Sequence, residues 1–362
     1  MSTAKTSATR NVRRRLLAWY RVNKRSMPWR NTRDPYAIWI SEAMLQQTRV
    51  ETVIPYWQRF IEKFPDVHAL ATAEPDDVLG AWAGLGYYSR ARNLQAAARV
   101  IDDEHGGELP DDVETLMSLP GIGRYTAGAV ASIAFDRPEP VLDGNVKRVL
   151  TRLLGIREDI AKPAVVERLW READALVQGS DAGELNQALM ELGATLCTRK
   201  ATRCADCPLG EQCDALRAGD AMKLPIKAKK KKPRKVAAVA ALVLRRGKAL
   251  AVKRPSGGLL GGLWDLPGAE LARGAEPAGA LIDALSERVG LTVSNATHVG
   301  SVEHIFTHRN LTLHVFRCTG ARGRTRITGF DAHRWLSQPA ISQLPHAAVT
   351  AKALALLAGG SG

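Results

Sequence analysis

Residues 118–126 are Ser-Leu-Pro-Gly-Ile-Gly-Arg-Tyr-Thr. A helix-like segment precedes this stretch and an Ala-rich helical segment follows it, so the Pro-Gly-x-Gly core predicts a very tight turn between two helices. Because Gly121 and Gly123 lack a Cβ atom, backbone N–H groups at the start of the second helix can approach a phosphate closely. The stretch therefore has two interpretations, a phosphate-binding helical hairpin or a plain turn, and the Gly pair alone does not decide between them.

Helical periodicity extends from this turn in both directions, over residues 12–216. Residues 89–104, which begin at a candidate N-cap, Ser89, and residues 165–177 show it well. The apolar positions that share one helix face are Leu94, Ala97, Ala98 and Ile101 in the first segment and Val166, Leu169, Ala173 and Leu176 in the second. We predict an all-α domain over residues 1–225.

The pattern changes after the Lys/Arg/Pro run at 227–235, which is too charged to pack and predicts a linker over residues 226–236. Residues 235–244 and 249–253, joined by a Gly-containing turn at 245–248, predict a β-hairpin. A helix at 277–289, strands near 293–302 and 310–317, and a terminal helix from about His346 complete the pattern. We predict a separate α+β domain over residues 237–362.

Composition and charge narrow the function classes. Hydrophobic residues make up 45% and charged residues 24% of the 362 residues, which is ordinary for a globular protein. No run approaches the ~20 apolar residues that cross a bilayer, so we expect no membrane partner.

Residues 1–33 hold ten basic side chains and no acid, and residues 221–235 hold eight more, whereas the rest of the chain is net −4. Such local positive charge favours a nucleic-acid partner over solvated charge runs, although the Arg-rich start also resembles a transit peptide.

Four of the five cysteines are closely spaced. Cys197, Cys204, Cys207 and Cys213 follow a C-x6-C-x2-C-x5-C pattern, and Cys318 lies in the other predicted domain. Four thiolates within 17 residues suit a tetrahedral sulfur site, which means zinc or an iron–sulfur cluster. Disulfides and a thioredoxin-like pair at Cys204 and Cys207 are weaker alternatives, because the chain is long and no βαβ unit surrounds the pair.

Residues 141–146, Val-Leu-Asp-Gly-Asn-Val, end a loop and open a predicted helix over 146–154. They place Asp143 and Asn145 at the beginning of that helix, where either side chain could serve as a simple N-cap.

These features match one family when three N-terminal motifs are added. The motifs are Met-Pro-Trp-Arg at 27–30, Trp-Ile-Ser-Glu-Ala-Met-Leu-Gln-Gln-Thr at 39–48 and Gly-Leu-Gly-Tyr-Tyr-Ser-Arg at 84–90. Residues 10–355 resemble the endonuclease III, or helix-hairpin-helix, superfamily of DNA glycosylases, and within it the adenine DNA glycosylases of the MutY type. The resemblance implies a [4Fe-4S] cluster on the four cysteines. It also implies a Nudix-like module as the α+β domain.

The resemblance implies roles for two carboxylates. Glu42 would protonate adenine at N7, Asp143 would stabilise or transiently bond C1′ of the sugar, and Tyr125 and Asn145 would order the site. The apolar neighbours of Glu42 should raise its pKa, whereas Asp143, in a polar loop near a helix N-terminus, should stay ionised. Without the family, a surface helix residue is the weaker alternative for Glu42. Bifunctional relatives carry Lys at the position of Tyr125, so we expect a monofunctional enzyme.

The resemblance also implies DNA contacts. Gln46, Gln47 and Tyr87 match wedge residues that fill the gap left by the extruded base, and Thr48 and Leu85 match positions beside 8-oxoguanine. The further expected contacts are Arg30, the hairpin glycines Gly121 and Gly123, and the segment Phe306, Thr307 and His308, where the family has Phe-Ser-His. Core packing is the alternative, above all for Leu85. Glu287 alone matches the metal-ligating Glu residues of Nudix hydrolases, so we do not expect pyrophosphate hydrolysis.

We therefore expect a base-excision repair enzyme that removes adenine mispaired with 8-oxoguanine or guanine in double-stranded DNA. We expect the protein to be a monomer. We also expect a bacterial-type localisation, in the cytoplasm and on the nucleoid. The alternatives are a thymine-mismatch or endonuclease III-like glycosylase and a noncatalytic lesion-binding protein.

Overall fold

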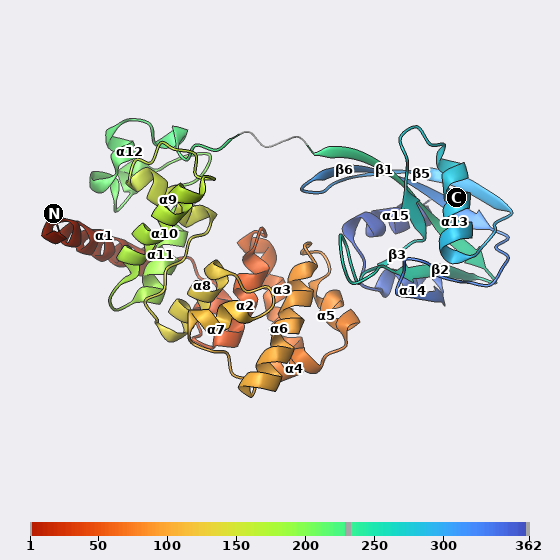
Figure 1. Ribbon diagram of the computed structural model, residues 1–362, viewed down its shortest axis with the longest axis horizontal. Coiled ribbons are helices and arrows are strands. Elements are labelled where there is room, and N and C mark those ends of the chain that lie inside the picture. The colour runs from red at the N-terminus through yellow and green to blue at the C-terminus, as the bar shows by residue number, and fades with distance from the viewer. Residues whose placement is uncertain (1, 229–232, 360–362) are drawn as a thin grey trace. The chain divides into compact units, whose positions relative to one another are not determined.

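The computed structural model describes residues 2–228 and 233–359 (Figure 1). The chain forms two compact units, the first from Met1–Thr72 and Asn93–Lys229 and the second from Ala73–Arg92 and Lys230–Gly362. The predicted order of a helical part followed by an α+β part is confirmed. The domain boundaries at 225 and 236 stay predictions, and residues 229–232 of the predicted linker lie outside the described residues.

The first unit is helical. Its α-helices are α1 (Ser2–Asn23), α2 (Pro35–Leu45), α3 (Val50–Lys63), α4 (Val67–Thr72), α7 (Val113–Ser118), α8 (Arg124–Phe135), α9 (Gly144–Leu153), α10 (Pro163–Val177), α11 (Ala182–Thr195) and α12 (Asp214–Arg217). Its short 3-10 turns are η1 (Pro28–Arg30), η2 (Cys204–Asp206), η3 (Gly210–Gln212) and η4 (Ala221–Lys223). Helix α6 (Ser89–His105) begins in the second unit and continues into the first.

One hydrophobic core of this unit lies between α1, α9, α10 and α11. Two glycines allow close backbone contacts, because a Cβ atom on Gly128 of α8 would lie 2.3 Å from the carbonyl oxygen of Pro140 in the following loop, and one on Gly183 of α11 would lie 2.4 Å from that of Ser132 in α8. The helices predicted at 89–104 and 165–177 are confirmed as α6 and α10, with their apolar faces largely buried.

The Pro-Gly-x-Gly stretch forms the predicted turn between α7 and α8. Gly121 has φ +76°, and a Cβ atom there would lie 2.5 Å from Cβ of Asn93, so this position requires glycine for the turn itself. Gly123 differs, because it is the N-cap of α8 and a Cβ atom there would meet nothing within 4 Å. Its open surroundings leave the start of α8 accessible, as the phosphate-binding interpretation requires.

The second unit is built on one mixed sheet. Its strands are β1 (Arg234–Arg245), β2 (Lys248–Lys253), β3 (Trp264–Asp265), β4 (Gly268–Glu270), β5 (Asn295–Ile305), β6 (Arg309–Thr319) and β7 (Ala332–Leu336). Its further helices are α5 (Pro75–Trp82), α13 (Pro277–Val289), α14 (Gln338–Gln343) and α15 (Ala348–Gly359). The strand order is β3-β2-β1-β6-β5, with β4 beside β1 and β7 beside β2. β1 and β6 are parallel, and the other pairs are antiparallel.

The hairpin predicted at 235–253 is confirmed as β1 and β2 (Figure 1). Arg246 and Gly247 both have positive φ, which matches the twist of a two-residue hairpin turn. β1 already begins at Arg234, so the end of the predicted linker is strand. The predicted α13 packs Leu281 and Leu285 against the sheet. Among the described residues, no helix is long and apolar enough to span a membrane.

Candidate active site and nucleic-acid contacts

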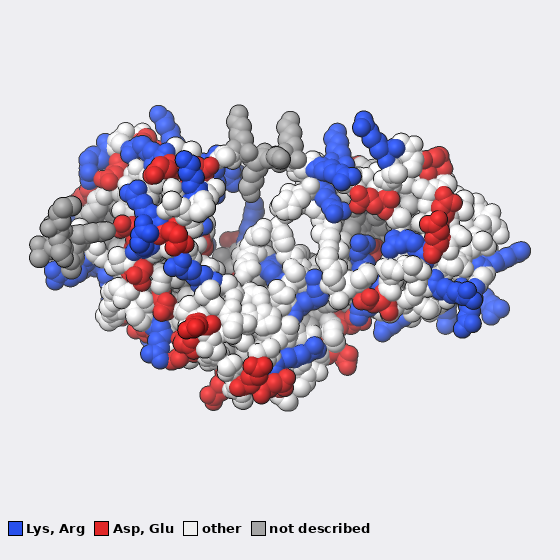
Figure 2. All heavy atoms as spheres, in the orientation of Figure 1, with Lys and Arg blue, Asp and Glu red and all other residues white. Residues whose placement is uncertain are grey.

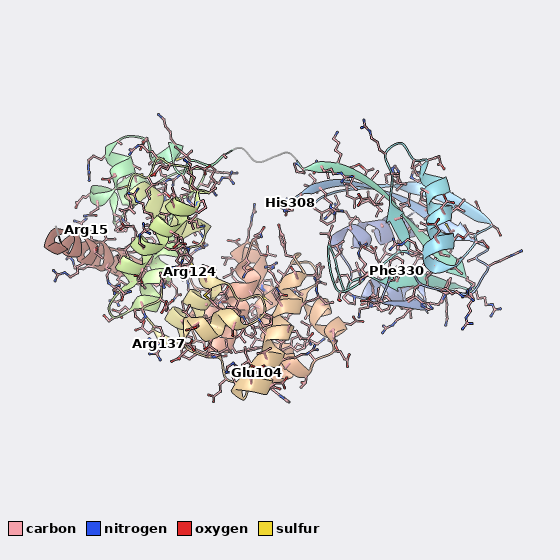
Figure 3. All side chains as sticks on the ribbon, in the orientation of Figure 1. Arg15, Glu104, Arg124, Arg137, His308 and Phe330 are labelled. Carbon is pink, nitrogen blue, oxygen red and sulfur yellow. The ribbon has the colours of Figure 1, made fainter. Side chains whose placement is uncertain are left out.

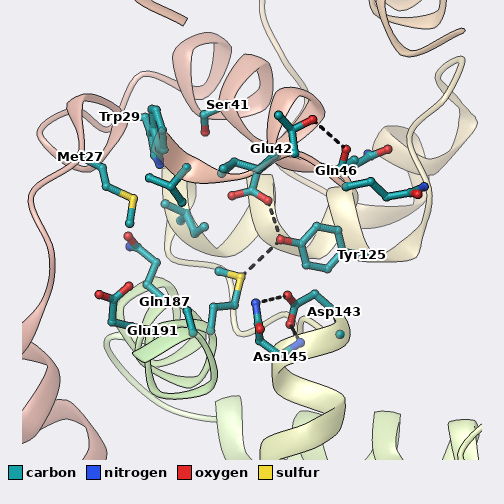
Figure 4. Close-up of a pocket in the computed structure, with 18 of the residues that line it drawn as sticks. Met27, Trp29, Ser41, Glu42, Gln46, Tyr125, Asp143, Asn145, Gln187 and Glu191 are labelled. Carbon is teal, nitrogen blue, oxygen red and sulfur yellow. Dashed lines mark hydrogen bonds between the residues drawn. The ribbon is translucent and has the colours of Figure 1, made fainter. Parts of the chain in front are cut away.

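A cavity of about 610 Å³ opens in the first unit between η1, α2, α8, α11 and the start of α9 (Figure 4). Predicted site residues that line it are Arg30, Glu42, Gln46, Gln47, Thr48, Tyr125, Asp143 and Asn145. The fold therefore brings together side chains from four separate segments of the chain, and the volume is within the usual range for a small-molecule pocket.

Glu42 lies on α2, a helix whose residues from Tyr36 to Met44 are all buried. Only 5% of Glu42 is exposed, and the Tyr125 hydroxyl donates to Glu42 Oε2 over 2.6 Å (Figure 4). Burial raises the pKa of Glu42 to about 7; the Tyr125 hydrogen bond opposes this rise and the nearby Asp143 adds to it. The alternative that Glu42 is a surface helix residue is wrong, and its pKa is raised as its apolar neighbours predict.

Asp143 is the N-cap of α9. Its Oδ1 accepts from the backbone N–H groups of Asn145 (2.9 Å) and Val146 (2.7 Å), and its Oδ2 accepts from Asn145 Nδ2 (2.8 Å). Burial nevertheless raises the pKa of Asp143 against these donors, so its surroundings are less polar than the loop sequence predicts. The N-cap interpretation is thus correct. The capping hydrogen bonds also hold the Asp143 carboxylate in the cavity, so the N-cap role and a role in the site are compatible.

Sequence reasoning missed a third acid in the cavity wall, Glu191. Only 1% of its side chain is exposed, and it pairs with Arg25 Nε at 2.7 Å and Arg30 Nη2 at 2.9 Å. Burial favours the neutral acid, but the two guanidiniums hold the pKa of Glu191 below its ordinary value. Only 10% of the Arg30 side chain is exposed, so its guanidinium is held inside the unit and its contact with DNA stays a prediction. A single Glu in a helix gives no sequence signal of this pairing.

The start of α9 is tied to the first cysteine by Arg148. Its Nη2 donates to Asn145 Oδ1 over 2.8 Å, and its Nε donates to the Cys197 carbonyl oxygen over 2.7 Å. Arg148 therefore links the loop that follows α11 to Asn145 in the cavity wall.

The four spaced cysteines line one small cavity of about 30 Å³. All are free thiols, so the disulfide interpretation is wrong. Arg152 Nη1 donates to Cys197 Sγ over 3.2 Å. Within residues 2–228 and 233–359, no three Cys, His, Asp or Glu side chains are arranged to hold a single metal ion. Four thiols are the donor set that both zinc and an iron–sulfur cluster use, so the residues present fit either group.

Two of the predicted wedge residues have unusual backbone conformations. Gln47 has φ +60° and Tyr87 has φ +48°, both in the left-handed region that non-glycine residues rarely adopt. Such strain is typical of functional sites. Gln46 Nε2 donates to Thr126 Oγ1 over 3.3 Å. Leu85 is only 6% exposed, which agrees with the core-packing alternative for that residue.

In the second unit, Tyr87 lies beside the segment Phe306–His308, which is predicted to contact 8-oxoguanine. Phe306, Thr307 and His308 form the turn between β5 and β6, with His308 at its end (Figure 3). The Tyr87 hydroxyl lies 2.6 Å from Thr307 Oγ1, and both residues line a cavity of about 560 Å³. The sequence places these residues in different predicted domains, yet the fold joins them.

The basic start of the chain is partly neutralised. In α1, Arg15 pairs with Glu211 and Arg21 pairs with Glu184, while Arg13 donates to the carbonyl oxygen of Leu176. Basic and acidic side chains are interspersed over the face drawn in Figure 2. The helix thus contributes to packing as well as to positive charge, and Leu16 and Tyr20 are buried in the core.

Comparisons with known proteins agree with this geometry. Residues 40–174 match the family described as HhH-GPD superfamily base excision DNA repair protein, and residues 238–356 match the NUDIX domain. The chain is 38% identical to an adenine DNA glycosylase of Rattus norvegicus over 90% of this chain and 73% of the relative. It is 37% identical to that of Homo sapiens over 89% and 69%. A solved thermostable thymine-DNA glycosylase matches with a TM-score of 0.55 and 27% identity, over 60% of this chain and all of that one. The predicted fold class of a helical glycosylase domain followed by an α+β Nudix-like domain is confirmed, and the chain belongs to the adenine DNA glycosylase family.

Proposed function

We propose that this protein excises adenine mispaired with 8-oxoguanine or guanine in double-stranded DNA, acting as a monomer. It hydrolyses the N-glycosidic bond and leaves an abasic site in an intact strand. One observation carries the proposal: Glu42, a buried acid with a pKa of about 7, shares a cavity of about 610 Å³ with Asp143.

The two carboxylates suit the two charges of the reaction. Neutral adenine is a poor leaving group, so Glu42, about half protonated at pH 7, gives its proton to N7. The bond to C1′ breaks with its electron pair on the base, and the sugar becomes cationic. Asp143, held by three N–H donors, stabilises C1′ until water adds there and its proton returns to Glu42. Tyr125 and Asn145 orient one carboxylate each through their hydrogen bonds.

The absence of strand cleavage follows from Tyr125. A phenol cannot form an imine with C1′, and its hydroxyl is already engaged with Glu42. Lys147 and Lys227 also line the cavity, so trapping with borohydride is a necessary check.

Recognition requires that adenine leave the duplex. Gln46, Gln47 and Tyr87 fill the vacated stack, and the strained backbone of the latter two supports this role. Thr48 and Leu85 lie beside the 8-oxoguanine, which Phe306, Thr307 and His308 also contact. Gly121 and Gly123 present the start of α8 to a backbone phosphate, and the open surroundings of Gly123 support this contact.

The four cysteines hold a [4Fe-4S] cluster in this proposal. The all-thiol donor set and the N–H contact to Cys197 support it. When bound, the cluster would cross-link loop 197–213 through iron–sulfur bonds.

The test uses duplexes that pair A, C, G or T with 8-oxoguanine or guanine, followed by alkali to reveal abasic sites. Release of adenine alone, opposite 8-oxoguanine and guanine, is the expected result. Release of thymine instead would favour a thymine-mismatch glycosylase, and tight binding with no release would favour a noncatalytic lesion-binding protein.

A further inference from the structure

The segment Ala73–Arg92 is separated in sequence from the C-terminal sheet, yet it forms one compact unit with it. The segment contains α5 and the turn that carries Tyr87. Its attachment to the sheet therefore determines where Tyr87 lies relative to Thr307.

The charged part of this attachment is made by Asp76. Its Oδ1 lies 2.6 Å from Lys253 Nζ, and its Oδ2 accepts from Trp264 Nε1 over 3.1 Å. Lys253 and Trp264 are direct cross-strand partners in β2 and β3, so the sheet register fixes both donors side by side. The Asp76 and Lys253 side chains are 28% and 23% exposed, which shields the pair partly from solvent.

Two further hydrogen bonds end on main-chain atoms. Tyr88 donates its hydroxyl to the His346 carbonyl oxygen over 3.0 Å, and Arg92 Nη1 donates to that of Gly261 over 2.5 Å. The Asp76–Lys253 pair differs from these bonds, because both of its partners are side chains and the same interaction can be removed from either side.

A rigid connection runs from Asp76 to Tyr87. Asp76 lies in the first turn of α5, and Trp82 ends that helix. Trp82 Nε1 then donates to the Gly86 carbonyl oxygen over 3.2 Å, directly before Tyr87. A shift at Asp76 is thereby transmitted through α5 to the strained Tyr87.

We propose that Asp76, Lys253 and Trp264 are positioning residues that set the Tyr87–Thr307 contact and so the preference for adenine opposite 8-oxoguanine over adenine opposite guanine. The inference rests on the proposed function. None of the three residues lines the cavity that holds Glu42 and Asp143, so excision itself does not depend on them.

The test measures single-turnover adenine release from the two mispairs and takes the ratio of the rates. Asp76→Asn and Lys253→Met should each lower the ratio about three- to tenfold, while the rate opposite guanine stays within about twofold. The double variant should be no worse than either single variant, because both remove one interaction. Asp76→Glu, which keeps the negative charge, should retain much of the wild-type ratio. Asp77→Asn, the same change at an exposed neighbour in the same helix turn, should leave the ratio unchanged.

The outcomes separate this inference from the function on which it rests. No adenine release from either mispair would refute the proposed function and the inference together, whereas adenine release with a wild-type ratio near one would overturn the inference alone. A preference for 8-oxoguanine that survives in both single variants would overturn the inference alone. Additive losses in the double variant would also overturn it, because they would mean that Asp76 and Lys253 act independently.

Discussion

Replacing Glu42 with Gln should stabilise the protein at alkaline pH while it abolishes adenine release. Glu42 is 5% exposed, and its pKa rises from an ordinary value of 4.5 to about 7. At about 1.4 kcal/mol per pKa unit, an ionised carboxylate at this position destabilises the folded state by ~3 kcal/mol. Gln keeps the shape and can still accept the Tyr125 hydroxyl, but it never carries the charge.

The sign of the effect follows from the raised pKa. Below about pH 4.5, Glu42 is neutral in the folded and unfolded states, and its contribution to stability is fully present. Between about pH 4.5 and 7 the folded state binds the extra proton, so wild-type stability falls as pH rises and the loss is complete above the folded pKa. Relative to wild type, Glu42→Gln should therefore gain about 2 to 3 kcal/mol between pH 5 and pH 8.5.

Urea unfolding at these two pH values measures the difference. Glu62→Gln, the same change at an exposed position of α3, is the matched control and should show no such pH-dependent gain. An equal offset between Glu42→Gln and wild type at both pH values would show that the Glu42 pKa is not raised, and the argument from burial would be wrong.

Three other predictions concern the cofactor, the absence of strand cleavage, and the two glycines of the turn between α7 and α8. Elemental analysis should find about four irons and no stoichiometric zinc per chain; one zinc per chain would contradict the cluster. Wild type should give no covalent product with borohydride, whereas Tyr125→Lys should give some trapped enzyme and strand cleavage; efficient wild-type trapping would implicate Lys147. Gly121→Ala should lower the free energy of unfolding by roughly 1 to 3 kcal/mol, because its Cβ would meet Asn93 at positive φ. Gly123→Ala should instead leave urea unfolding nearly unchanged and weaken DNA binding, and equal unfolding effects at the two glycines would contradict their different roles.

Long periodic segments were predictable from the sequence. Helices α6, α10 and α13 and the β1–β2 hairpin lie where hydrophobic spacing and turn residues place them. Strands β3 and β4 span only two and three residues, too few for an alternating pattern, and their pairing depends on neighbours distant in sequence. The attachment of Ala73–Arg92 to the C-terminal sheet was equally invisible, since local spacing carries no information about contacts such as Asp76 with Lys253.

The identities of the candidate site residues were predictable from the sequence, but the burial of these residues was predictable only in part. The resemblance to the glycosylase family identified Glu42, Tyr125, Asp143 and Asn145, and the fold gathers all four in one cavity. Sequence neighbours also gave the direction of the Glu42 pKa. The burial of Asp143 could not be predicted, because it depends on helices far away in the chain.

The pH dependence of adenine release tests the central claim most directly, that a buried, protonated Glu42 is the acid. Single-turnover release from a duplex with adenine opposite 8-oxoguanine would be measured from pH 5 to 9. The rate should fall above a midpoint near pH 7, by about tenfold per pH unit at the alkaline end, as Glu42 loses its proton. A rate that stays flat to pH 9, or normal release by Glu42→Gln, would contradict the account.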